Sequence, residues 1–153
     1  MACSLLMQAA TMKQTKFLIS AAGVIGLLAV FAFPYISAEG FSFKYWDLHK
    51  FPADSTVGLL NGPKQVYIAL GCFIVPVLAG LVAIATKQLQ RWQAVIAGVF
   101  SLAAFACEGV RKGLTGDHDV STAIGGKLLF LAAAAGLVFA IMGAVKPEPA
   151  PRV

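Results

Sequence analysis

Residues 65–86, QVYIALGCFIVPVLAGLVAIAT, and residues 92–110, WQAVIAGVFSLAAFACEGV, are two apolar runs joined by only five residues, KQLQR. An α-helix needs about 20 apolar residues to cross about 30 Å of hydrocarbon. Each run has about this length. Because the link between them is so short, the pair is predicted to form an antiparallel helical hairpin. Arg91 and Trp92 together are typical of an anchor at a membrane boundary.

Two further runs of the same kind flank this hairpin, at residues 17–38 and 124–145. The composition agrees, since 59% of the 153 residues are hydrophobic and only 12% are charged, against about 25% charged in a soluble domain. The sequence therefore predicts an all-α membrane protein, an antiparallel bundle of four transmembrane helices in a single domain over residues 1–153. Pro76 should bend the second span.

The first run also has features of a secretory signal peptide, because two lysines precede it and Ile36-Ser37-Ala38 ends it. The apolar region of a signal peptide has about 7–15 residues, which is shorter than residues 17–38. Three more runs follow as well. We therefore expect an uncleaved first span. Met12 is an alternative start of translation, which would remove Cys3.

The basic residues indicate how the spans are oriented. The net charge is +5, but the twelve Lys and Arg residues form no basic stripe, which excludes nucleic-acid binding. Their counts on the two sides are equal, and only their density in short segments without acids distinguishes the sides. The positive-inside rule then predicts cytoplasmic termini, outer loops at 39–64 and 111–122, and a mobile proline-rich tail at 146–153. The expected localisation is a bacterial inner membrane.

Small residues recur at spacings that place them on one face of a helix, where helices in lipid can approach closely. The candidates for helix packing are Gly23, Gly26, Ala132, Gly136, Ala140 and Ala144. We interpret them as contacts within the bundle. The alternative is that the face of the fourth span docks a second copy or a larger partner.

The first outer loop opens with an aromatic segment, FSFKYW, at residues 41–46. Its period of two predicts a short strand. The aromatic residues Phe41, Phe43, Tyr45 and Trp46 fit the interfacial belt of a membrane protein. The alternative interpretation is a recognition surface for a partner, because aromatic residues are enriched in interface cores.

Charged residues cluster near the outer ends of the third and fourth spans. Glu108 precedes Arg111 and Lys112 by three and four residues, which places all three on one helix face. Lys127 should lie at a similar depth on the fourth span. The sequence predicts a structural ion pair among Glu108, Arg111 and Lys127, close enough to the boundary for the long side chains to reach water.

Both histidines of the chain are in the outer loops, close to acidic residues. His49, His118, Asp117 and Asp119 could together bind a metal ion through nitrogen and oxygen ligands. Their spacing matches no specific motif, so an ordinary solvated loop is the preferred interpretation, and no cofactor is expected. Cys72 and Cys107 lie in apolar runs, where cysteine behaves as a small apolar residue.

Two resemblances follow from this layout. The residues Phe33-Pro34-Tyr35, Gly40 and Tyr45-Trp46-Asp47-Leu48 resemble a pattern in a loose set of small uncharacterised bacterial four-span membrane proteins. The topology is also similar to that of claudins, but the first outer loop is shorter and lacks the paired cysteines of that family. Neither resemblance implies an activity.

The absence of several catalytic and transport motifs narrows the range of expected functions. No ionisable residue lies near the middle of a span, and CxxC, P-loop and GxSxG motifs are absent from the sequence. We expect a non-enzymatic protein that acts in the lipid bilayer through contacts with other membrane proteins or itself, as an accessory or scaffold subunit or homo-oligomer. The alternatives are a transport or channel protein with an oligomeric pore, with Glu108 and Lys127 at its mouth, and an outer-face metal or ligand sensor.

Overall fold

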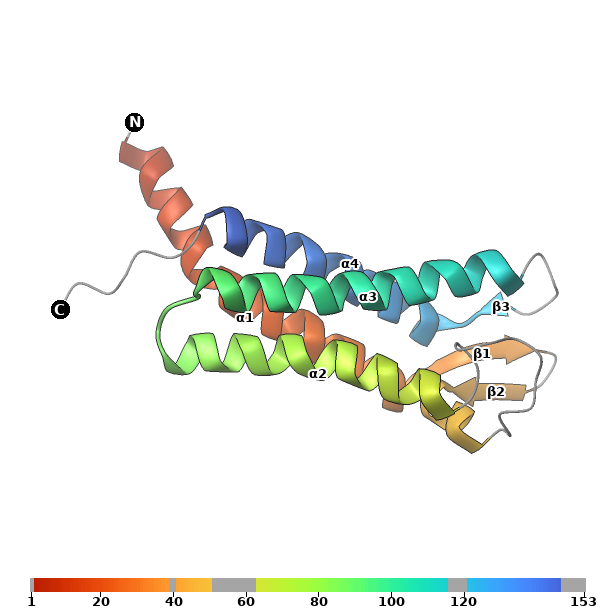
Figure 1. Ribbon diagram of the computed structural model, residues 1–153. Helices are drawn as coiled ribbons and strands as arrows, with labels where there is room; N and C mark the ends of the chain where they lie inside the picture. Colours follow the sequence, from red (N-terminus) through yellow and green to blue (C-terminus); the bar gives the residue numbers. More distant parts are fainter. Residues whose placement is uncertain (1, 39–40, 51–62, 116–120, 147–153) are drawn as a thin grey trace.

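The protein is a long bundle of helices with a small sheet at one end (Figure 1). The computed structural model describes the backbone of residues 2–38, 41–50, 63–115 and 121–146, and the side chains of residues 14–35, 42–47, 49–50, 64–108 and 123–146. Its α-helices are α1 (Ala2–Phe31), α2 (Pro63–Ala85), α3 (Arg91–Thr115) and α4 (Ile124–Val145).

The helices are arranged in a ring. α1 packs against α2 and α4, and α3 packs against the same two helices. Figure 1 shows α2 and α3 side by side, connected at the end of the bundle that lies opposite the sheet. We call these two ends the link end and the sheet end.

Three of the helices contain a stretch that is long and apolar enough to cross a membrane. These stretches are Gln14–Phe31 in α1, Lys64–Ala85 in α2 and Ile124–Val145 in α4. α4 coincides with the predicted run, and α2 differs from its predicted run by one or two residues at each end. α3 contains all of the predicted run 92–110 and continues to Thr115.

The prediction for the first run was wrong at its C-terminal end. The helix was expected to reach Ala38, but α1 ends at Phe31 and residues 34–38 form strand β1. Pro34 explains the difference, because it lacks a backbone N–H and disfavours helical geometry in the residue before it. The apolar character of residues 34–38 continues that of the helix, and so composition alone did not mark the boundary.

The strand predicted in the first outer loop is present as part of a three-stranded sheet. β1 (Pro34–Ala38) lies between β2 (Phe41–Lys44) and β3 (Ser121–Thr122), and both pairings are antiparallel. β2 ends at Lys44, two residues before the end of the alternating segment. A 3₁₀ helix, η1 (Tyr45–Lys50), follows it directly.

The link between α2 and α3 is a tight turn stabilised by its own side chains. Lys87 has a φ of 59°, in the left-handed region that ends many helices. At the start of α3, the backbone N–H of Gln90 donates to Gln93 Oε1 at 2.9 Å, as in a capping box. Lys16 of α1 donates from Nζ to the carbonyl of Lys87 at 3.0 Å, which joins α1 to this turn.

The helices approach each other closely where one of them has a glycine. A Cβ atom at Gly26 of α1 would lie 2.1 Å from Cδ1 of Phe73 of α2, whose ring is buried. A Cβ atom at Gly136 of α4 would lie 2.7 Å from Oγ of Ser101 of α3. Helices surrounded by lipid gain little from hydrophobic burial, so such close contacts are the main source of their association.

We predict that Gly26→Ala lowers the free energy of unfolding by about 1–3 kcal/mol, because the new methyl group overpacks the contact with Phe73. Gly71→Ala is the matched control, since a Cβ atom there meets nothing within 4 Å. The control should be neutral or stabilising by up to about 1 kcal/mol, as alanine favours the helix. Thermal unfolding in detergent measures both. Equal effects of the two substitutions would contradict the packing described here.

Candidate functional site

The sheet end of the bundle encloses a carboxyl group. Glu108 of α3 is only 5% exposed, and the phenol oxygen of Tyr35 in β1 lies 3.1 Å from its Oε1 and 3.0 Å from its Oε2. The Tyr35 hydroxyl therefore donates a hydrogen bond that both carboxylate oxygens can accept. A hydrogen bond to an ionised group contributes about 1.5–3 kcal/mol. This bond connects the sheet to α3 across the interior.

Backbone contacts hold Tyr35 in this position. The backbone N–H of Ala123, just before α4, donates to the Tyr35 carbonyl at 3.0 Å. A Cβ atom at Gly125 would lie 2.7 Å from the Pro34 carbonyl oxygen, so only glycine allows α4 to begin this close to β1. β1 is thus fixed between β2 on one side and the start of α4 on the other.

Tyr45 lies inside the bundle. It is 1% exposed, and its ring packs edge-to-face on Tyr35 with a centroid distance of 4.5 Å and an interplanar angle of 83°. Aromatic pairs in this geometry stabilise by about 0.5–1.5 kcal/mol beyond their burial. This burial argues against the alternative interpretation in which Tyr45 belongs to a recognition surface for a partner. The alternating pattern did not reveal the burial because Tyr45 begins η1 and does not continue β2.

Gln65 adds an amide to the same region. It lies in the first turn of α2 and is 5% exposed. Its Nε2 is fully buried, and no hydrogen-bond partner for that atom lies among the described residues. Gln65, Tyr45 and Glu108 line one small pocket between the helices. We call Tyr35, Tyr45, Gln65 and Glu108 the polar cluster.

The predicted ion pair is not present between the described side chains. Lys127 is exposed at the start of α4 and makes no ion pair there with Glu108, which accepts the hydrogen bond from Tyr35. The side chain of Arg111, the other predicted partner, lies outside the described residues, as does that of Lys112. The sequence placed Glu108 at the correct end of the bundle but did not identify its tyrosine partner.

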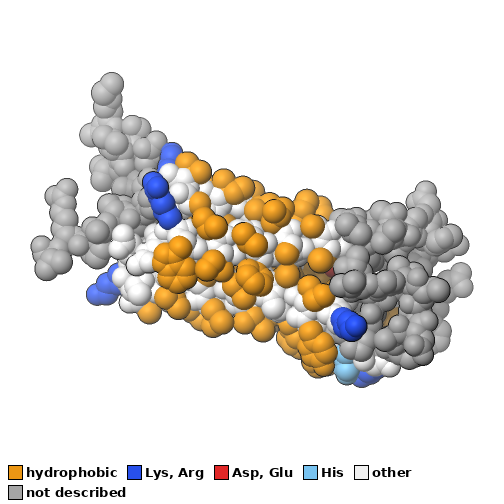
Figure 2. All heavy atoms as spheres, in the orientation of Figure 1, with side chains coloured by type: hydrophobic (Ala, Val, Ile, Leu, Met, Phe, Trp, Pro, Cys, Tyr) orange, Lys and Arg blue, Asp and Glu red, His pale blue; other side chains and the backbone are white. Residues whose placement is uncertain are grey.

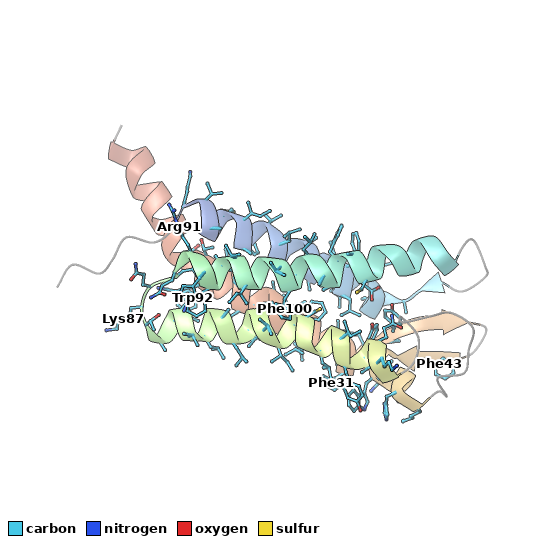
Figure 3. All side chains as sticks on the ribbon, viewed as in Figure 1. Phe31, Phe43, Lys87, Arg91, Trp92 and Phe100 are labelled. Atoms are coloured by element: carbon cyan, nitrogen blue, oxygen red, sulfur yellow. The ribbon has the colours of Figure 1, made fainter. Side chains whose placement is uncertain are left out.

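The other aromatic residues of the predicted recognition surface differ in their exposure. Phe43 of β2 is 38% exposed, and Figure 3 shows it at the sheet end, beyond the first turn of α2. Trp46 of η1 is half-buried and packs on Phe31 of α1, with a centroid distance of 5.2 Å. The side chain of Phe41 lies outside the described residues. Phe43 and part of Trp46 therefore remain candidates for an outer contact.

Only part of the possible metal site lies among the described residues. His49 contacts the Trp46 carbonyl through Nδ1. In the same helix, Lys50 donates a hydrogen bond to Asp47 at 2.8 Å, and this bond lowers the pKa of Asp47. Outside the described residues lie the other predicted ligands, His118, Asp117 and Asp119. Within the described part of the chain, no three His, Cys, Asp or Glu residues come together as a metal site would require.

The small residues singled out from the sequence lie in contacts within the chain. Gly23 approaches Val77 of α2, since a Cβ atom there would lie 2.6 Å from Val77 Cγ2. On α4, Ala132, Gly136 and Ala140 are buried, whereas Ala144 is half-buried. This face of α4 packs on its neighbours in the bundle and is not available to a second copy.

Two residues of the polar cluster, Tyr35 and Gln65, were not identified from the sequence. Tyr35 follows a proline at the end of an apolar run, a position where an interfacial tyrosine is common. Gln65 is a polar residue at the beginning of a run, which is equally ordinary. Only the pairing of β1 with β2 and β3 brings Tyr35 over the end of α3, and this long-range contact has no local signal.

We predict that Tyr35→Phe lowers the free energy of unfolding by about 1.5–3 kcal/mol, because it keeps the ring but removes the hydroxyl that donates to Glu108. Tyr67→Phe on α2, where the side chain is 61% exposed, is the matched control and should have little effect. Chemical unfolding in detergent micelles measures the difference. A Tyr35→Phe protein as stable as the control would show that this hydrogen bond contributes nothing.

Comparison with known proteins adds no family: no family model, curated protein or solved structure matches this chain.

Proposed function

We propose that this chain is a four-span protein of a bacterial inner membrane that acts without catalysis, through contacts with other membrane proteins. The observation that carries the proposal is the outer surface of the helices. Figure 2 shows apolar side chains covering the middle of the bundle, with lysine and arginine near its ends. Large apolar side chains are exposed on all four helices, and representatives are Leu28, Leu78, Val99 and Leu131. Water would disfavour such a surface, whereas hydrocarbon suits it.

The position of α3 supports its role as the fourth span. α3 packs between α2 and α4, both of which are apolar enough to cross a membrane. Val95, Val99 and Leu102 of α3 are each more than half exposed. Between Arg91 and Glu108 the helix carries no charged residue. A helix packed alongside two spans, with an apolar outer face of its own, fits the same hydrocarbon layer.

The charged residues support cytoplasmic termini. Lys87 and Arg91 lie at the link end, together with the exposed Trp92 (Figure 3). Lys146 follows α4 at the same end. This basic, aromatic boundary is the pattern expected of the cytoplasmic side. The sheet end, with β2 and η1, would then face outward.

The contact surface for a partner is proposed to lie at the sheet end. The small-residue faces of the helices are used inside the bundle, so they offer no interface. β2 is at the edge of the sheet, and Ser42, Phe43 and Lys44 are all exposed. An edge strand with an exposed aromatic residue can pair with or pack on another protein.

An oligomeric pore has less support. The Glu108 side chain is buried among Tyr35 and the other members of the polar cluster, so it does not line a surface between copies. Flux through proteoliposomes would favour the pore only if it were abolished by Glu108→Gln.

In a background with Cys3, Cys72 and Cys107 replaced by alanine, Ser42→Cys should react with a membrane-impermeant maleimide in intact spheroplasts, because it lies outside. Lys87→Cys at the link end should react only after permeabilisation. Labelling is read on a gel by mass shift. Equal labelling of both positions in intact spheroplasts would contradict the arrangement.

A photo-crosslinking amino acid at position 43 should give a discrete adduct with one protein when the full chain is expressed in its membrane. The same group at position 99 faces lipid in the proposed arrangement and should give no discrete protein adduct. Mass spectrometry identifies the product. Adducts from position 99 but none from position 43 would move the interface to the helices and refute a contact surface at β2.

A further inference from the structure

A small pocket beside the polar cluster has the properties of a binding site. It lies between α2, α3 and α4 at the sheet end and has a free volume of about 10 Å³. This is close to the smallest volume that holds a single water molecule. Gln65, Glu108 and Tyr45 are among its lining residues, and apolar atoms form nearly all of the lining surface.

The amide of Gln65 provides an independent sign of an occupant. Gln65 is 95% buried, and its Nε2 has no hydrogen-bond partner among the described residues. A buried donor without an acceptor costs about 1–3 kcal/mol. Replacing the glutamine with an apolar side chain would avoid this cost, so its presence in the pocket wall suggests that an acceptor binds there.

The chemistry of the pocket defines that acceptor. An N–H group requires an oxygen with a free lone pair, and the volume limits the group at this point to one heavy atom of about that size. Ile68, which is 40% exposed on the outer face of α2, forms part of the lining. The pocket therefore borders the outer surface of the bundle, at the level of the first turn of α2. In the proposed membrane arrangement this is the depth of the outer interface.

We propose that the pocket binds one oxygen hydrogen-bond acceptor, held by the Nε2 group of Gln65. Two sources have this chemistry: a water molecule, and the ester carbonyl oxygen of a phospholipid in the outer leaflet. The lipid source rests on the proposed four-span arrangement, whereas the water source does not. Binding places a hydrogen-bonded group next to Glu108 and completes the polar cluster.

Nuclear magnetic resonance of the full chain in lipid nanodiscs tests the proposal. The Nε2 signal of Gln65 is assigned by its loss in Gln65→Met. The spectrum is recorded in ester-linked phosphatidylcholine and in the ether-linked analogue, which has no carbonyl. Gln93 is the internal control, because it is a buried glutamine (2% exposed) at the link end, far from the pocket, and its Oε1 accepts a hydrogen bond from the backbone N–H of Gln90.

A Gln65 signal that shifts between the two lipids, with Gln93 unchanged, assigns the acceptor to the ester carbonyl. A signal that is the same in both lipids and shows cross-relaxation to water assigns it to water. A signal that is the same in both lipids with no contact to water overturns the proposal. Failure of the chain to enter nanodiscs would instead contradict the proposed membrane arrangement.

The unfolding temperature of Gln65→Met provides a second test with opposite outcomes. If an acceptor binds, the substitution removes its hydrogen bond, and the unfolding temperature falls. If the amide has no occupant, the substitution removes an unsatisfied donor, and the unfolding temperature rises. A rise would overturn the proposal even if the resonance signals were too broad to interpret.

Discussion

The close contact between helices at small residues is the interaction on which the rest of the structure depends. Large apolar side chains occupy the outward faces of all four helices, so burial of apolar surface cannot distinguish the inside of the bundle from its surroundings. The complementary shapes of the helix surfaces determine which faces pack inside the bundle. Phe73 fills the space left by Gly26, and Ser101 fills the space left by Gly136. These contacts fix the helices at short distances.

At the sheet end, where the helices stop, strand pairing provides hydrogen-bond partners for the backbone N–H and C=O groups. Pro34 ends the helical geometry of the first span, and the following residues would carry free backbone groups near the membrane boundary. Strand β1 pairs with β2 and β3 on its two sides, which satisfies these groups. The same pairing places Tyr35 over Glu108. Pairing of the backbone in the sheet thus produces the buried phenol–carboxyl contact between Tyr35 and Glu108, and with it the candidate site.

The sequence predicted the elements whose signals are local. The run at 124–145 coincides with α4, the five-residue link gives the hairpin, and the aromatic alternation gives β2. It failed where distant segments decide the outcome. Tyr45 was assigned to the interfacial belt or to a recognition surface, but it begins η1 and its side chain is buried. For Glu108 the sequence indicated Arg111, Lys112 and Lys127 as partners, but it gave no sign of the tyrosine that β1 supplies. Local composition contains no information about either contact.

The four-span arrangement requires α3 to lie in hydrocarbon, because α3 carries Glu108 and packs between α2 and α4. A spin label at position 99 on α3, in reconstituted bilayers, measures this directly through its collisions with dissolved oxygen and with a water-soluble nickel complex. The same label at position 131 on α4 is the reference. If α3 is a membrane span, both labels should collide frequently with oxygen and rarely with the nickel complex. Frequent collisions with nickel at position 99 alone would show α3 in water and contradict the four-span bundle.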